Sequence, residues 1–309
     1  MAVYGVDAGG TRIKLALIEG GRILARTAMD ARSDLGLREQ LPRIAAALKG
    51  LSAQSTEVTG IGVAFPSLVD RDTGRVLGHV GKYRDAQDLD LNEWARTEFD
   101  LPLAIDNDAR LACIGEWQHG SGRGYSNVVM VTLGTGIGTG VIMDGRPLRG
   151  KHGQAGILGG HFVMDPNGRL CACGARGCAE TQASTARLPE LAMEQPDFQT
   201  SCLRNCRPLD YEAVFSAALA GDPCAVRLRE RGIEVWAAVG VSLIHAYDPE
   251  AVVYGGGIMA SGESTLSPIR SIIECDAWTP WGKPPVVASG LGNDAALIAC
   301  EWLLEERRL

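Results

Sequence analysis

The chain has 309 residues, 46% of them hydrophobic and 22% charged, which is typical of a soluble globular protein with one or two domains and excludes a disordered chain. Its formal net charge of −7 provides no basic surface for nucleic acid or for an anionic membrane, and no apolar stretch is long enough to cross a bilayer. The nine cysteines are an odd number and residues 1–29 lack the pattern of a secretory signal, so a cytoplasmic protein with free thiols is expected.

The first part of the chain predicts alternating strands and helices. The turn DAGGTR separates two apolar strands, and a glycine hairpin at Gly20 and Gly21 leads into a third. Helical spacing and short buried runs follow, and Asp106 or Asn107 would cap the last helix of this part. The expected strands are 3–6, 13–18, 23–28, 61–65 and 103–105, and the expected helices are 38–48, 91–99 and 108–118.

The pattern restarts at residue 128. A strand at 128–133, a glycine turn at 134–140 and a second strand at 141–143 closed by Asp144-Gly145 repeat the order of the first half. Further on, the sequence predicts helices at 210–220, 224–247 and 294–305 and a strand at 251–254. The expected fold is therefore α/β in two similar lobes, residues 1–106 plus 291–309 and residues 107–290, with ligands bound in loops between them.

Three glycine-rich turns are candidates for nucleotide binding. In DAGGTRIK (7–14) the glycines would let backbone N–H groups approach a phosphate, Thr11 adds a hydroxyl, and Asp7 would hold Mg²⁺ through its water shell. LGTGIGTG (133–140) connects two strands, which disfavours a dinucleotide-binding fold. Each could be a plain turn, but the repeated arrangement predicts two phosphate clamps facing each other across a cleft. VVYGGGI (252–258) would pack against adenine or simply lead into a helix.

A strand-to-helix junction and a cysteine cluster carry the remaining chemistry. Asp108 would be kept ionised by the helix dipole and suits an acceptor of a hydroxyl proton, although capping by Asn107 and Asp108 is the structural alternative. Cys171, Cys173 and Cys178 fit C-x-C-x₄-C, and with His161 they form the Cys₃His set of structural zinc. The other six cysteines, Cys202 and Cys206 among them, are expected to be buried apolar residues or incidental surface thiols.

In chain order, DAGGT, NDA, GTGIGTG, CACGARGC followed by Glu180, and GGG resemble the ROK family of sugar kinases in the actin-like ATPase superfamily. The resemblance runs nearly end to end. It implies a two-lobed actin-like ATPase (ribonuclease H-like) fold with duplicated βββαβαβα-type lobes. The chain length and VAFPSLVD (63–70) are similar to those of the allose kinase branch in particular.

The resemblance also implies a reaction, the ATP-dependent phosphorylation of a hydroxyl on a hexose or hexose-like sugar or polyol. Asp108 would be the general base, and zinc would fix the loop that carries His161 and Glu180. A homodimer or homotetramer is implied as well. The residues implied to bind sugar are Asn107, His161 and Glu180, and those implied to bind ATP and Mg²⁺ are Asp7, Gly9, Gly10, Thr11, Lys14, Thr135, Gly136, Gly256 and Gly257.

Two other functions stay open. A catalytically weak ROK-type sugar sensor is the main alternative, although a pure sensor needs no base beside a nucleotide site. A polyphosphate hydrolase of the same superfamily would not need a zinc-braced sugar loop. The family's repressors carry a helix-turn-helix domain ahead of the first glycine turn, and with so few residues before Asp7 no such domain is expected here.

Three departures from the family pattern bear on the substrate. The histidine loop of the family usually reads A-G-E-x-G-H, whereas this chain reads AGILGGH, with Ile157 or Leu158 in place of the glutamate and one extra glycine. In GKYRDA (81–86), Lys82 stands in place of a sugar-facing asparagine, and Arg110 replaces a second asparagine after NDA. Losing a hydroxyl acceptor should change which sugar fits. The two cations are either surface charges or the sign of a substrate with an acidic substituent.

Overall fold

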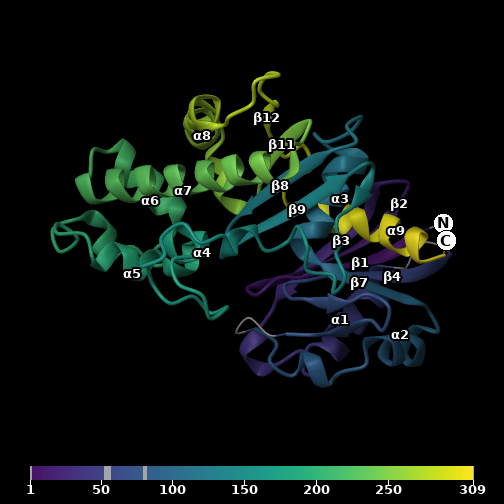
Figure 1. Cartoon of the computed structure of the whole chain (residues 1–309). Coiled ribbons are helices and arrows are strands. Elements are labelled where there is room, and N and C mark those ends of the chain that lie inside the picture. Colours follow the sequence, from purple (N-terminus) through teal and green to yellow (C-terminus); the bar gives the residue numbers. More distant parts are fainter. Residues whose placement is uncertain (1, 52–56, 79–81, 309) are drawn as a thin grey trace. The chain divides into compact units, whose positions relative to one another are not determined.

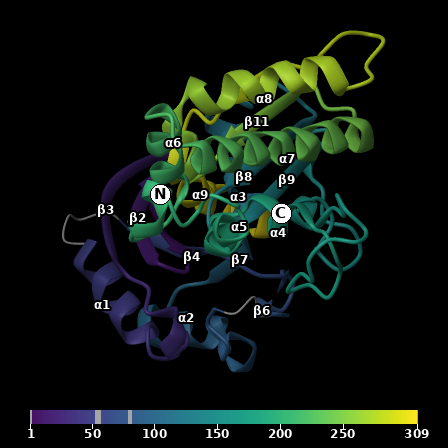
Figure 2. The same ribbon diagram turned by 90° about the vertical axis from the view of Figure 1, so that its left-hand side faces the viewer.

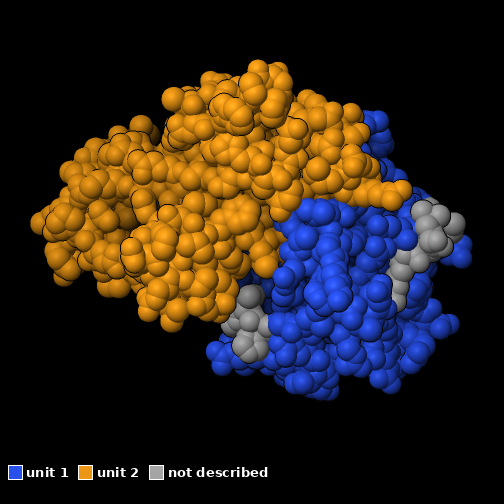
Figure 3. Space-filling model, in the orientation of Figure 1, with its two compact units in different colours: residues 1–123, 147–156, 294–309 blue, residues 124–146, 157–293 orange. Residues whose placement is uncertain are grey.

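The computed structural model describes residues 2–51, 57–78 and 82–308, and the chain divides into two compact units. Unit 1 comprises residues 1–123, 147–156 and 294–309, and unit 2 comprises residues 124–146 and 157–293 (Figure 3). The division expected from the sequence, 1–106 plus 291–309 and 107–290, differs mainly at helix α3 (Asp108–His119). This helix belongs to unit 1 because it packs against α9 (Ala295–Arg308). The division into lobes itself stays a prediction.

Unit 1 is built on a five-stranded sheet in the order β3-β2-β1-β4-β7. Strands β1 to β3 form an antiparallel meander, and β4 and β7 are added parallel to β1. The strands are β1 (Ala2–Ala8), β2 (Arg12–Glu19), β3 (Arg22–Asp30), β4 (Val58–Phe65) and β7 (Leu103–Asn107), and a short pair is formed by β5 (Val69–Asp70) and β6 (Arg75–Val76). The helices are α1 (Leu41–Leu51), α2 (Leu91–Phe99), α3 and α9.

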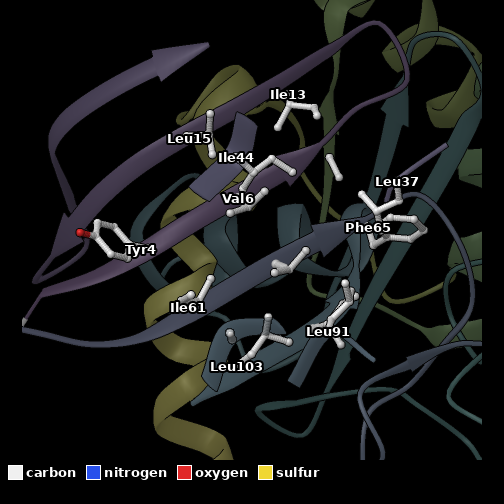
Figure 4. Close-up of a cluster of buried hydrophobic side chains, with 14 of the residues drawn as sticks. Tyr4, Val6, Ile13, Leu15, Leu37, Ile44, Ile61, Phe65, Leu91 and Leu103 are labelled. Carbon is white, nitrogen blue, oxygen red and sulfur yellow. The ribbon is translucent and has the colours of Figure 1, made fainter. Parts of the chain in front are cut away.

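The core of unit 1 forms because its central strands are apolar on both faces. Helix α9 lies along β1 and β4 (Figure 1), and a buried cluster that includes Ile13, Ile61 and Leu103 fills part of the unit (Figure 4). Each fully buried aliphatic side chain contributes about 1.5–3 kcal/mol to folding. This packing holds the carboxyl ends of the parallel strands, and with them Asn107 and Asp108, in fixed positions.

Unit 2 repeats this topology with a second sheet in the order β10-β9-β8-β11-β12. Strand β9 is antiparallel to β8. Strand β11 is added parallel to β8, and β12 is added parallel to β11, as β4 and β7 are added in unit 1. Helices α7 and α8 lie side by side (Figures 1 and 2). The elements are β8 (Val128–Leu133), β9 (Ile137–Met143), β10 (Arg146–Pro147), α4 (Ala179–Ala183), α5 (Leu188–Met193), α6 (Tyr211–Leu219), α7 (Pro223–Tyr247), β11 (Ala251–Gly255), α8 (Glu263–Asp276) and β12 (Val286–Ala288).

The main differences from the expected elements lie in unit 2. The glycine turn expected at 134–140 is shorter, because β9 already begins at Ile137 and carries Gly138 and Gly140 within a strand. Helix α8 was not expected from the sequence, since Pro268 interrupts its helical pattern. Among the described residues, no helix combines the length and apolar character that a membrane span requires.

Candidate active site and metal site

The turn between β1 and β2, which we call the phosphate turn (Gly9 and Gly10), is held in place by hydrogen bonds to its carbonyl groups. The Tyr83 hydroxyl donates to the Gly9 carbonyl at 2.8 Å, and Ser33 Oγ donates to the Gly10 carbonyl at 2.9 Å. A Cβ on Gly9 would lie 2.6 Å from the Arg12 carbonyl oxygen, so only glycine fits there. Thr11 follows the turn and is exposed.

The strands that flank this turn carry a pair of opposite charges. Asp7 on β1 and Lys14 on β2 face each other in the sheet register, and Lys14 Nζ donates to Asp7 Oδ2 at 2.9 Å. The Asp7 carboxyl is largely shielded, with a side-chain exposure of 15%. A carboxylate beside a glycine turn of this kind has the chemistry to hold the water shell of Mg²⁺.

Asn107 ends β7 and caps α3, as one of the two alternatives from the sequence predicted. Its Oδ1 accepts from the backbone N–H groups of Ala109 and Arg110, both at 3.1 Å. Its Nδ2 donates to the Ser67 carbonyl at 3.3 Å and to Asp108 Oδ1 at 3.2 Å. The Asn107 side chain therefore orients Asp108, and its role toward a sugar stays a prediction.

Asp108 is a half-buried carboxylate at the first position of α3. Burial, and then the charge of Asp7, raise the pKa of Asp108 to about 6, although the Ala109 N–H at 2.8 Å and the Lys82 ammonium lower it. The sequence argument expected the helix dipole to keep this group ionised. Desolvation outweighs the helix end, but with a pKa near 6 the group is still mostly ionised at neutral pH. A base that is poised near the working pH is well suited to proton transfer.

Lys82 extends over the phosphate turn. A Cβ on Gly10 would overlap Cδ and Cε of Lys82 and lie 2.5 Å from its Nζ. The ammonium group is also close enough to Asp108 to lower the pKa of that carboxyl. Gly81, which precedes it in the GKYRDA motif, lies outside the described residues.

Arg110 is neither the surface charge nor the open pocket cation that the sequence suggested. It is 2% exposed, and its Nη1 donates to Asp106 Oδ1 at 2.6 Å. Its Nη2 donates to the Gly153 and Ala155 carbonyls at 2.5 and 3.1 Å, while Arg149 Nη1 reaches the other oxygen of Asp106 at 2.5 Å. Arg110 therefore ties α3 to the segment that precedes the histidine loop. Asp106 lies in β7 and Arg110 in the first turn of α3, so no local sequence pattern marks this pair.

The glycine loop of unit 2, Gly134 to Gly136, is bound to the segment that follows the cysteines. Glu180 Oε2 accepts from the Ile137 N–H at 3.1 Å, and a Cβ on Gly136 would overlap the same oxygen. The Gly134 and Thr135 carbonyls accept at 3.1 and 3.0 Å from the backbone N–H groups of residues 185 and 186. Thr135 itself is exposed. Glu180 therefore lies at the glycine loop, and its binding to sugar stays a prediction.

The GGG motif also follows the topology, because it ends β11 beside β8. Gly256 has a φ of +89°, and a Cβ there would lie 2.6 Å from the Leu133 nitrogen, so glycine is required for this close approach. A Cβ on Gly257 would have nothing within 4 Å. Gly257 is exposed, and the space where a Cβ would point is open, which suits a flat ligand.

The four predicted zinc ligands come together. Their donor atoms all lie within 4.8 Å of one another, with 3.5 Å between Cys171 Sγ and His161 Nδ1 and 3.6 Å between the sulfurs of Cys173 and Cys178. Tetrahedral zinc with Zn–S bonds of about 2.3 Å requires sulfur–sulfur distances of about 3.8 Å. The cluster therefore fits a four-coordinate ion. Of the other cysteines, Cys113, Cys224 and Cys300 are buried, Cys202 and Cys275 are exposed, and Cys206 is half-buried.

The histidine loop has no carboxylate at the position where the family has its glutamate. Ile157 is 6% exposed and belongs to the core, whereas Leu158 is 36% exposed. The two glycines that follow pack tightly, since the Gly159 N–H donates to Thr139 Oγ1 at 2.9 Å and a Cβ on Gly160 would overlap the Ile137 carbonyl. This loop therefore presents an apolar side chain where a hydroxyl acceptor was expected.

The ROK family model matches residues 3–307 of the chain. The glucokinases of Thermotoga maritima and Halalkalibacterium halodurans are 32% and 33% identical to it, over 99% and 98% of this chain and 98% and 94% of their own lengths. The crystal structure of a ROK family glucokinase from Streptomyces griseus, in complex with glucose and AMPPNP, matches with a TM-score of 0.84 at 30% identity over 98% of this chain and 99% of that one. The two-lobed, actin-like α/β fold expected from the sequence is confirmed. Since the family model spans nearly the whole chain, the protein belongs to the ROK family.

Proposed function

We propose that this protein is a carbohydrate kinase that transfers the γ-phosphoryl group of ATP to a hydroxyl of a hexose or hexose-like polyol. The observation that carries the proposal is the Asp108 carboxylate, which lies at the start of α3 near Asp7 with a pKa of about 6. A sugar-binding protein that performs no chemistry has no use for a base of this kind beside a phosphate turn. The resemblance to glucokinases over the full chain supports the same reaction.

In the proposed step, Asp108 removes the proton from the acceptor hydroxyl while the hydroxyl oxygen attacks the γ-phosphorus. The bond from that phosphorus to the bridging oxygen breaks, and ADP leaves with the electron pair. Such transfers depend on positioning and charge neutralisation more than on covalent catalysis. Asp7 would hold Mg²⁺, which would neutralise phosphate charge. The glycine turns at Gly9–Gly10 and Thr135–Gly136 would bind the phosphates, and Gly256–Gly257 would bind the adenosine.

The sugar would be bound by Asn107, His161 and Glu180. Glucose is the first candidate, because the similar enzymes are named glucokinases. However, the buried Ile157 cannot accept hydrogen bonds from a sugar hydroxyl, so we expect a preference that differs from theirs. The chain length and VAFPSLVD (63–70), from which the sequence predicted the allose kinase branch, make allose a second candidate, although the similar enzymes are named glucokinases.

His161, Cys171, Cys173 and Cys178 would hold a structural zinc ion. All four positions are provided by protein, so the ion would brace the loop that carries His161 rather than activate water. We also propose a homodimer or homotetramer in the cytoplasm, as expected from the family and from the free thiols.

A coupled assay of ADP release over a panel of hexoses, amino sugars, inositols and sugar acids tests the proposal. We expect ADP release and sugar phosphate in equal amounts with one group of hexoses, and an arm with polyphosphate in place of ATP identifies the donor. If the protein binds a sugar of the panel but releases ADP with none of them, the sugar sensor is favoured instead.

A further inference from the structure

The side chain of Lys82 lies at the phosphate turn, whereas the family pattern assigns its position to a sugar-facing asparagine. Its Cδ and Cε cover Gly10 on the side where any other residue would carry a Cβ, and its Nζ lies 2.5 Å from that Cβ position. A phosphate bound by the backbone of this turn would therefore meet an ammonium group directly.

The charge of Lys82 is available to a ligand. The Lys82 side chain is half-buried, and within residues 2–51, 57–78 and 82–308 its Nζ has neither a hydrogen-bond partner nor an ion-pair partner. Lys14, by contrast, is engaged with Asp7 at 2.9 Å. A half-buried cation beside a phosphate turn is suited to an anionic ligand, because a partly desolvated charge attracts its counter-ion more strongly than an exposed one.

The backbone next to Lys82 is fixed at some conformational cost. Tyr83 has a φ of +48°, which is unfavourable for a large side chain, and its ring is fully buried against Phe65 with centroids 5.6 Å apart. Its N–H donates to the Ser33 carbonyl at 3.1 Å, and its hydroxyl donates to Gly9. Tyr83 thus joins the chain that carries Lys82 to the phosphate turn and to Ser33, and it fixes the backbone from which the lysine side chain extends.

We propose that Lys82 is a catalytic residue that contacts the terminal phosphoryl group of ATP and stabilises its charge during transfer. This inference rests on the proposed kinase function and adds to it a cation on unit 1. The ammonium would act as a point charge on the phosphoryl oxygens, as lysines do in other phosphate sites. By the same position it keeps the pKa of Asp108 from rising further.

The test compares K82M and K82R with the wild-type protein and with R84M, a control that removes an exposed cation two residues away. Calorimetry measures the affinity for AMPPNP and for ADP, each with Mg²⁺, and steady-state kinetics give kcat and the sugar KM. We expect K82M to lose affinity for AMPPNP but not for ADP, and to lower kcat by about 10²–10³-fold, as losing one stabilising group at a developing charge does. The sugar KM should hardly change, K82R should recover part of the loss, and R84M should match the wild-type protein.

The alternative, a sugar-facing Lys82, predicts the opposite division. A raised sugar KM with kcat retained, and equal affinities of K82M and wild type for AMPPNP, would overturn the inference. Thermal unfolding of K82M shows whether this variant is folded. If K82M is unfolded, the AMPPNP affinity, kcat and sugar KM of K82R distinguish the two roles of Lys82. If the wild-type protein neither binds AMPPNP nor releases ADP, the proposed function fails together with the inference. If the wild-type protein is an active kinase and only the results for the Lys82 variants differ from those expected, the inference about Lys82 fails and the proposed function stands.

Discussion

Each unit has a glycine turn between the first two strands of its sheet, but side chains of different charge lie against the two turns. In unit 1 the turn between β1 and β2 is covered by the cation of Lys82, with the carboxylates of Asp7 and Asp108 close by. In unit 2 the loop between β8 and β9 is bound by the carboxylate of Glu180, which follows the cysteine cluster. In the proposed function, the duplicated scaffold would provide two backbone sites for phosphate. The segments that connect the strands would give each site its own chemistry, a base and a cation in unit 1 and a loop braced by zinc in unit 2.

Removing the proposed zinc ion should have the largest effect on stability and activity, because the loop that carries His161 in unit 2 would lose its brace. We expect C171S to lose bound zinc, all kinase activity and several kcal/mol of stability, since structural zinc contributes about 10–16 kcal/mol to small zinc domains. Metal analysis should find about one zinc per wild-type chain. C275S, which changes an exposed thiol outside the cluster, is the control. A C171S protein with wild-type melting temperature and activity would argue against a structural zinc.

The two glycine sites can be compared directly with matched alanine variants. In G10A the added methyl group displaces Lys82, and in G136A it displaces Glu180, in both cases a side-chain end and not backbone. We therefore expect both variants to fold. G10A should lower kcat by about tenfold or more, as expected for the loss of a positioned charge, whereas G136A should mainly raise the sugar KM. Identical kinetic effects of the two variants would mean that the units do not divide the work as described.

The activity should depend on pH through Asp108. Its pKa of about 6 lies above the usual aspartate value of 3.8, and the base must be ionised to accept a proton. The value of kcat/KM should therefore fall about tenfold per pH unit below pH 6 and level off above pH 7. In K82M the midpoint should move to higher pH, because Lys82 lowers the pKa of Asp108. A profile without a limb between pH 5 and 7 would exclude Asp108 as the group that titrates.

The smallest expected effect is a gain in stability. Because the pKa of Asp108 is higher in the folded protein than the usual value of 3.8 that it has in the unfolded chain, its carboxylate costs stability above pH 6. That cost disappears as the pH falls below about 4. D108N should then raise the unfolding free energy by about 1–2 kcal/mol at pH 8, and by nothing near pH 3.5. Chemical denaturation at both pH values measures the difference, and a D108N protein that is less stable at pH 8 would contradict the origin given for the raised pKa.

Much of the fold follows from local sequence pattern, as α2 and β8 show, since both end where apolar spacing and turn residues predict. Strand β9 began earlier than expected because Gly138 and Gly140 weaken the strand signal, and only pairing with β8 reveals it. The clustering of His161, Cys171, Cys173 and Cys178 was predictable because these residues are close in sequence. The burial of Arg110 was not predictable, because it depends on carbonyl groups far away in the sequence. The course of Lys82 over Gly10 was not predictable either, because it depends on a positive φ at Tyr83 that no local pattern encodes.

The most direct test of the kinase mechanism is transfer of labelled γ-phosphate from ATP to the best sugar, measured for wild type and D108N side by side together with sugar affinity. Removing a general base typically costs about 10²–10⁴-fold in rate. We therefore expect D108N to bind the sugar as tightly as wild type and to transfer phosphate slower by that factor. Transfer by D108N at the wild-type rate would show that Asp108 is not the base and would contradict the account.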